Sequence, residues 1–110
     1  TLYDRIGGEQ AVGRLLDALR RKGLYDDTIV LYTSDHGDYL GFHHMLLKGN
    51  HLYDPLVRVP LLIKWAGGKD GGTVSQRLVN NVDIAPTLSL LVDAKPPSGA
   101  FGDPLVEVLR

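Results

Sequence analysis

An apolar segment in the first third of the chain runs directly into a cluster of polar residues. Residues 29–32 read Ile-Val-Leu-Tyr, and residues 33–37 read Thr-Ser-Asp-His-Gly. A short continuous apolar run is typical of a strand buried on both faces, as in a parallel sheet, and a glycine lets the backbone turn sharply after it. Ligands of open α/β sheets bind just past the carboxyl ends of the strands. We therefore expect Asp35 and His36 to lie at such an edge.

Helical spacing dominates the segment before this strand. A helix is predicted over residues 9–22, whose apolar side chains form one face made of Val12, Leu15, Leu16 and Leu19. Basic residues in its last turn suit the negative end of the helix dipole, and Gly23 follows as a C-cap. Asp26 and Asp27 are predicted to form the turn into the strand.

Two more strands are predicted beyond the middle of the chain. The apolar residues 61–65 indicate the first, with Pro60 at its start, where no ladder donor is needed. Residues 74–79 indicate a second short strand.

A second helix follows these strands. Asp83 is its predicted N-cap, Pro86 falls in its first turn, and it is expected to end near Val92; residues 103–110 are a further helical segment. The order of elements suggests part of an α/β sandwich, with too few strands for a complete doubly wound sheet.

Composition excludes several classes of function. The chain has 110 residues, a net charge of −1 and no cysteine. The charge gives no electrostatic footprint for nucleic acid or an anionic membrane. The missing cysteine excludes disulfides, thiolate metal sites and a cysteine nucleophile within this chain. No apolar run approaches the roughly 20 residues of a membrane span; the compartment, cytoplasmic or periplasmic, stays open.

Asp35 and His36 are the first candidates for chemistry. A carboxylate oxygen beside an imidazole nitrogen makes a good pair of metal ligands. The same Asp-His-Gly sequence also suits a plain turn, since Asp and Gly favour turns on their own account.

The connection that follows, residues 38–51, favours the functional interpretation. It holds His43, His44 and His51, three of the four histidines of the chain, together with Lys48. Loops with such side chains are often functional, although a packed or solvated histidine is an equal alternative for His43 and His44. Arg58, further on, could bind an anion or pair with a carboxylate.

Several blocks along the chain carry a resemblance to a known family. They are Gly13–Leu19, Gly23–Thr28, Ile29–Gly37, Leu40-Gly41, His43-His44, Lys48, Tyr53, Arg58–Ile63, Val82–Leu88 and Phe101–Leu105. In this order they resemble the sulfatase family of the alkaline phosphatase superfamily. The resemblance implies an α/β fold, a partial alkaline-phosphatase-like sandwich in which helices flank a mixed or parallel sheet, as a fragment of a larger domain.

The resemblance also implies roles for the candidate residues. Asp35 and His36 match the two ligands of a divalent cation, usually calcium. Histidine at the second position resembles the branch of arylsulfatases and phosphonate monoester hydrolases, where manganese is the alternative. Lys48 matches a lysine that contacts the sulfate or phosphonate oxygens, and His43 and His44 match a block that contributes to the catalytic pocket.

Part of the family pattern is absent from this sequence. The nucleophile is a formylglycine made from Cys or Ser in a Cys/Ser-x-Pro-x-Arg motif, and none of Ser75, Ser89 and Ser98 stands in that pattern. We therefore expect residues 1–110 to be a single segment, the second half of a catalytic domain, with the formylglycine in an upstream half that the segment lacks. Such a segment is expected to be inactive alone.

Three functions remain open at this point. The first is part of a sulfate ester hydrolase, the second is a hydrolase of phosphonate monoesters or phosphodiesters, and the third is a non-catalytic sulfatase-like module. The expected partner is a small-molecule sulfate or phosphonate ester, with no nucleic acid. A partial sheet exposes an edge and an apolar face, so a homo-oligomer is a further expectation.

Overall fold

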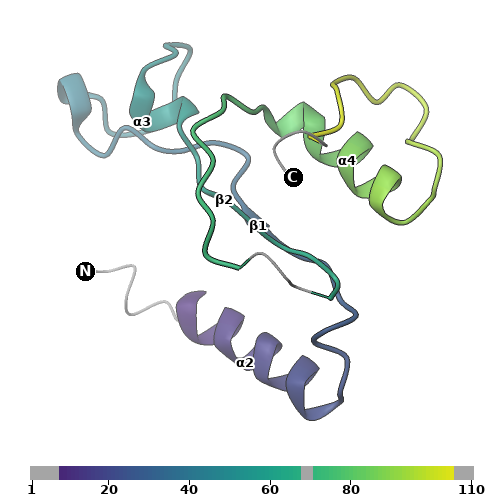
Figure 1. Cartoon of the computed structure of the whole chain (residues 1–110). Helices are drawn as coiled ribbons and strands as arrows, with labels where there is room; N and C mark the ends of the chain where they lie inside the picture. Colours follow the sequence, from purple (N-terminus) through teal and green to yellow (C-terminus); the bar gives the residue numbers. More distant parts are fainter. Residues whose placement is uncertain (1–7, 68–70, 106–110) are drawn as a thin grey trace. The chain divides into compact units, whose positions relative to one another are not determined.

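The computed structural model describes residues 8–67 and 71–105. The chain divides into two compact units, Thr1–Gly71 and Gly72–Arg110, and each is described by itself. Figure 1 shows their elements in chain order. None of the helices in the described residues is long and apolar enough to cross a membrane.

The first unit opens with α2 (Gly8–Arg21), which confirms the first predicted helix. Its end is a Schellman motif, because the N–H of Gly23 donates to Arg20 O (3.0 Å) and the N–H of Leu24 donates to Leu19 O (2.9 Å). Gly23 has a φ of 66°, which suits glycine. The predicted apolar face is half-buried except for Leu15, which is 59% exposed.

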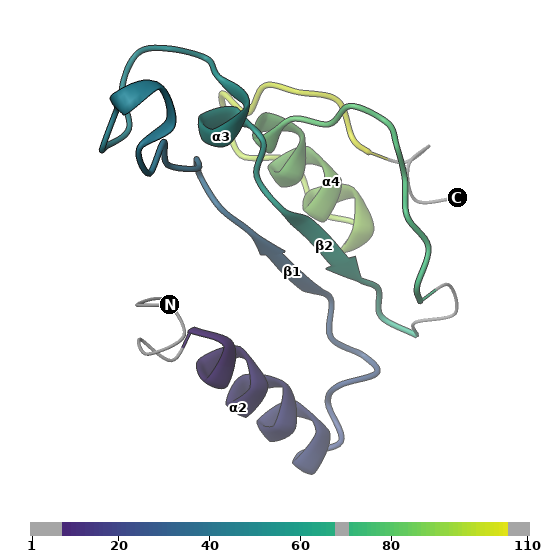
Figure 2. The same ribbon diagram turned by 90° about the vertical axis from the view of Figure 1, so that its left-hand side faces the viewer.

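The described sheet of this unit consists of β1 (Val30–Thr33) and β2 (Leu61–Lys64). The strands pair antiparallel, with Val30 opposite Lys64 and Thr33 opposite Leu61, and they lie side by side in both views (Figures 1 and 2). The expectation of a parallel strand buried on both faces is therefore wrong for this pair. The apolar run predicted a strand but carried no information on the direction of its partner.

One face of this strand pair exposes a pair of apolar side chains. Tyr32 and Leu62 are directly opposite each other and are 51% and 59% exposed. Their neighbours Leu31 and Ile63, also partners, are half-buried on the other face. Side chains alternate across a strand, so the exposed pair shares its face with Val30 and Lys64, which are half-buried. This face is exposed at one apolar pair, and the opposite face is half-buried.

The connection between β1 and β2 contains two short helices, η1 (Phe42–His44) and α3 (Asp54–Val57). Tyr39 and Leu56 are buried there, at 3% and 8% exposure. Pro55 stands in the first turn of α3, where its missing N–H costs no helical hydrogen bond. This small core supports the loop that follows β1.

The second unit contains η2 (Asn81–Asp83) and α4 (Ile84–Leu91). Asp83 directly precedes α4 and Pro86 lies in its first turn, as predicted, but Asp83 does not act as the predicted N-cap: it has helical backbone angles and makes no capping hydrogen bond to α4. Asn80 is the N-cap, and Asp83 is the third residue of its capping box. The Asp83 carboxylate accepts the backbone N–H of Asn80 (3.0 Å) and of Asp103 (3.1 Å). This one side chain therefore joins the start of the helical segment to the chain beyond α4.

A buried threonine makes a second connection within this unit. Thr87 is 1% exposed. Its hydroxyl donates to Asp83 O and accepts the N–H of Leu105 at 2.9 Å. Both hydrogen-bonding functions of the hydroxyl are thus satisfied, as burial requires.

The remaining expectations for this unit concern residues 74–79 and 103–110. The predicted strand over residues 74–79 is wrong, because these residues form an exposed irregular segment. Within the described ranges no element buries its apolar side chains, and Val74 and Leu78 are fully or almost fully exposed. Of the expected terminal helix, residues 103–105 are not helical and residues 106–110 lie outside the described residues.

Gly102 provides a test of the connection through Asp83. A Cβ at this position would lie 2.6 Å from Asp83 Oδ1 and from Val82 O, at a φ of +108°. Gly99 also has a positive φ, +81°, but open space around it. We expect Gly99→Ala to lower the free energy of unfolding by about 1 kcal/mol and Gly102→Ala by about 3 kcal/mol, measured by urea unfolding of the chain. Equal effects of the two substitutions would contradict the described packing.

Candidate functional site

The loop after β1 is organised by hydrogen bonds among neighbouring residues. Ser34 Oγ donates to His36 O at 2.7 Å, and the N–H of His36 donates to Asp35 Oδ1 at 3.0 Å. These bonds close a tight turn directly after the last residue of β1, Thr33. Asp35 and His36 therefore stand at the carboxyl end of the strand, as the sequence predicts.

The tautomer of His36 follows from its contacts. Nδ1 lies 2.7 Å from the carbonyl oxygen of Gly37. Because a carbonyl oxygen only accepts hydrogen bonds, Nδ1 carries the proton in this contact, and the neutral ring keeps a lone pair on Nε2. An imidazole held in this way is ready to accept a hydrogen bond or bind a cation through Nε2.

Lys48 reaches this lone pair from the other end of the long loop. Its Nζ lies 2.8 Å from His36 Nε2, and Asp35 Oδ2 lies 3.5 Å from the same nitrogen. The structure thus brings together three residues that the sequence selected, a carboxylate, an imidazole and an ammonium group. Since Nε2 is the acceptor, the lysine donates.

Asp35 faces solvent, with its side chain 85% exposed. The N–H of His36 lowers the pKa of this carboxyl below its usual value, the His36 ring lowers it further in the state in which that ring is protonated, and the hydroxyl of Ser34 adds to the effect. The carboxylate therefore stays ionised to a lower pH than an ordinary aspartate does.

The helix α3 supports the loop through the backbone. The N–H of Gly37 donates to Leu56 O at 2.7 Å. A Cβ at Gly37 would lie 2.0 Å from Pro55 O, so no other residue fits without a shift of the backbone. The position of His36 thus depends on contact between residue 37 and the end of the connection that returns to β2.

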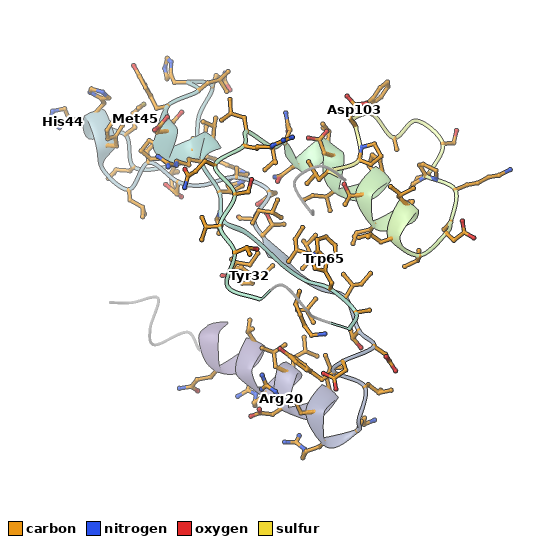
Figure 3. All side chains as sticks on the ribbon, in the orientation of Figure 1. Arg20, Tyr32, His44, Met45, Trp65 and Asp103 are labelled. Atoms are coloured by element: carbon orange, nitrogen blue, oxygen red, sulfur yellow. The ribbon has the colours of Figure 1, made fainter. Side chains whose placement is uncertain are left out.

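His43 and His44 lie elsewhere on the loop. Both have positive φ values, 50° and 63°, and both are exposed. The ring of His43 lies 4.3 Å from that of Phe42 and 5.1 Å from that of Tyr53. No hydrogen bond or ring contact in the described part of the chain joins either histidine to His36 or Lys48. Figure 3 labels His44 beside Met45 on this segment.

Tyr39 is a supporting residue that the sequence reasoning missed. It is buried, its hydroxyl donates to the carbonyl oxygen of His51, and its ring lies 3.5 Å from the position of a Cβ on Gly49. It therefore anchors the part of the loop that carries Lys48. An aromatic residue early in the loop after β1 was the available signal, but Phe42 in the same loop gives the same signal and is exposed.

Arg58 pairs with a carboxylate rather than standing alone. Its guanidinium lies 4.0 Å from Asp54, and both side chains are more than 80% exposed. Exposed pairs of this kind contribute little to stability.

A divalent cation fits the donors that the site presents. Asp35 supplies an ionised oxygen, and His36 supplies a nitrogen lone pair that already accepts a hydrogen bond from a cationic group, the ammonium of Lys48. Among the described residues, no three His, Cys, Asp or Glu side chains form a cluster that could hold a metal. These two residues therefore offer part of a coordination shell.

The sequence profile of the sulfatase family matches residues 8–94. The chain belongs to this family.

Individual relatives agree with this assignment. The N-acetylglucosamine-6-O-sulfatase of Bacteroides thetaiotaomicron is 37% identical over 102 residues, which are 93% of this chain and 18% of the relative. The multifunctional alkaline phosphatase superfamily protein PehA of Trinickia caryophylli is 32% identical over 92% of this chain and 20% of its own length. The chain thus spans about one fifth of the curated relatives it matches.

Solved structures confirm the α/β architecture. A protein determined in complex with its substrate D-glucosamine-2-N,6-O-disulfate has a TM-score of 0.83 and 35% identity over 94% of this chain and 21% of that one. The phosphonate monoester hydrolase of Silicibacter pomeroyi has a TM-score of 0.76 and 32% identity over 89% of this chain and 19% of that one. The predicted fold class, a part of the alkaline-phosphatase-like sandwich, is therefore correct.

Gly37 allows a direct test of the support from α3. Gly37→Ala is expected to lower the free energy of unfolding by about 3 kcal/mol, because the added methyl group meets a backbone oxygen that cannot rotate away. Gly13 lies inside α2 with open space around it, so Gly13→Ala is expected to raise it by about 0.5–1 kcal/mol. Urea unfolding of the two variants measures both. An unchanged midpoint for Gly37→Ala would contradict the close contact with Pro55.

Proposed function

We propose that this chain forms part of a metal-dependent hydrolase of sulfate esters. Membership of the sulfatase family supports the proposal. The single structural observation that carries it is the meeting of Asp35, His36 and Lys48 at the carboxyl end of β1. Residues 1–110 would be the second half of the catalytic domain.

Asp35 and His36 are the proposed metal ligands. The lowered pKa of Asp35 keeps its carboxylate ionised, and the carbonyl of Gly37 holds His36 in the tautomer with a free lone pair on Nε2. A carbonyl oxygen fixing the second nitrogen in this way is typical of metal-binding histidines. When bound, the cation supplies positive charge that lowers the pKa of a nucleophile and polarises the ester oxygens.

Lys48 is the proposed ligand of the transferred sulfate group. Nε2 of His36 has one lone pair, which serves either the ammonium of Lys48 or a cation. With Nε2 engaged in metal binding, the N–H groups of Lys48 would be available to the oxygens of a substrate. There the ammonium would stabilise negative charge that builds up in the transition state.

The nucleophile is proposed to lie outside these 110 residues. The family uses a formylglycine, and this chain has no cysteine and no serine in the required motif. His43 and His44 are proposed to line the substrate pocket from η1, where their side chains face solvent.

Calcium is the proposed metal, with manganese as the alternative. Calcium is usual in the family but prefers shells made entirely of oxygen. The imidazole nitrogen of His36 suits a transition metal better.

A phosphonate monoester or phosphodiester is the alternative substrate. The histidine at position 36 and the similarity to a phosphonate monoester hydrolase favour it. Sulfate and phosphonate groups present similar oxygens to Lys48, so the three residues fit both. A non-catalytic module is the third possibility, and it predicts that substitutions at the site have no effect on hydrolysis.

Replacement of Asp35 tests the metal site. In the protein expressed from the whole gene, Asp35→Ala is expected to reduce bound metal and to lower kcat/KM for nitrophenyl sulfate by about 100-fold or more, since it removes an ionised ligand. Asp27→Ala, in the turn before β1, is the matched control and should change neither. Metal content is measured by atomic emission. Unchanged metal and unchanged hydrolysis in Asp35→Ala would reject the proposal and favour the non-catalytic module.

The substrate class is tested by comparing two esters on the same protein. For a sulfatase, kcat/KM for nitrophenyl sulfate is expected to exceed that for nitrophenyl phenylphosphonate, with calcium and then manganese supplied. Lys48→Met should lower both rates, since the ammonium contacts oxygens that the two groups share. A higher rate on the phosphonate would assign the protein to the alternative.

A further inference from the structure

A second lysine of the first unit holds its ammonium group among backbone oxygens. Nζ of Lys64 donates to Tyr25 O at 2.6 Å, to Thr28 O at 3.0 Å and to Trp65 O at 3.0 Å. The three N–H groups of a lysine are thus matched by three acceptors. A fourth oxygen, that of Asp26, lies at 3.4 Å.

The ring of Tyr25 also lies against this ammonium, and the guanidinium of Arg20 approaches the same ring, 4.6 Å from its centroid. Nζ lies 4.4 Å from the centroid of the Tyr25 ring, over its face, which adds a cation–π attraction. The ion pairs found in the described residues do not include Lys64. The positive charge is therefore held by carbonyl dipoles and a π face, without a carboxylate.

Convergent carbonyl oxygens are the chemistry by which proteins bind weakly hydrated monovalent cations. Divalent cations such as calcium are usually bound with carboxylates in the shell. We propose that the carbonyl groups of residues 25, 28 and 65 form a monovalent-cation site, and that the ammonium of Lys64 is its resident ion. Removal of the ammonium then leaves a site for potassium or free ammonium.

The site joins the connection between α2 and β1 to the end of β2. Residues 24–28 connect α2 to β1, and Lys64 is the last residue of β2, opposite Val30. The N–H of Gly67 also donates to Asp26 O at 2.7 Å. Without a cation, three carbonyl groups would point at one another with no donor between them, which destabilises the connection.

The first measurement is the protection of Lys64 against acetylation in the unmodified chain. Competitive acetylation at limiting reagent, followed by peptide mass spectrometry, gives the relative reactivity of each lysine. Lys64 is expected to react about tenfold more slowly than the exposed Lys22 and Lys95, because its ammonium must leave three hydrogen bonds first. Equal reactivity of the three lysines would overturn the proposal.

Rescue by free cations is the second measurement. The melting temperature of Lys64→Met is followed in choline chloride, potassium chloride and ammonium chloride at one ionic strength. Potassium or ammonium is expected to raise it by about 5 °C over choline, with no such difference for the unmodified chain or for Lys95→Met. Lack of a difference between the salts, including the case in which the variant stays unfolded in all of them, would overturn the proposal.

Discussion

The antiparallel pairing of β1 and β2 is the constraint on which the first unit depends. Its register, with Val30 opposite Lys64 and Thr33 opposite Leu61, determines what each end of the pair can reach. At one end β1 leads into Asp35 and His36. At the other end β2 delivers Lys64 to the carbonyl groups before β1. A shift by one residue would turn every side chain of a strand to the opposite face and would separate both arrangements.

The site combines local and distant contributions. Ser34, Asp35 and His36 orient one another through bonds between neighbours, so this part forms wherever the turn forms. The position of Lys48 depends on the rest of the loop, which Tyr39 anchors through its hydrogen bond to the carbonyl oxygen of His51. The close approach of Gly37 to Pro55 and Leu56 then joins the two contributions.

The longer helices and the strands of the fold, and the residues of the candidate site, could be predicted from the sequence. Helical spacing and Gly23 gave α2, the apolar runs gave β1 and β2 to within one residue, and Asp83 with Pro86 marked α4. The grouping of Asp35 and His36 with Lys48 came from the motif. The antiparallel direction could not be predicted, since it depends on the path of the connecting segment. The irregular course of residues 74–79 depends on the absence of a burying neighbour in the described part of the unit, which a local pattern does not reveal.

The cradle around Lys64, formed by the carbonyl groups of residues 25, 28 and 65, limits the amino-acid sequence of the chain at few positions. Its oxygens belong to the main chain, which every amino acid carries, so the side chains of Asp26 and Asp27 contribute nothing to it and both are exposed. The two positions can therefore drift in identity while the cradle persists, provided that the turn is kept. Lys64 and the ring of Tyr25 against which its ammonium lies are the only parts of this site that depend on the identity of a side chain.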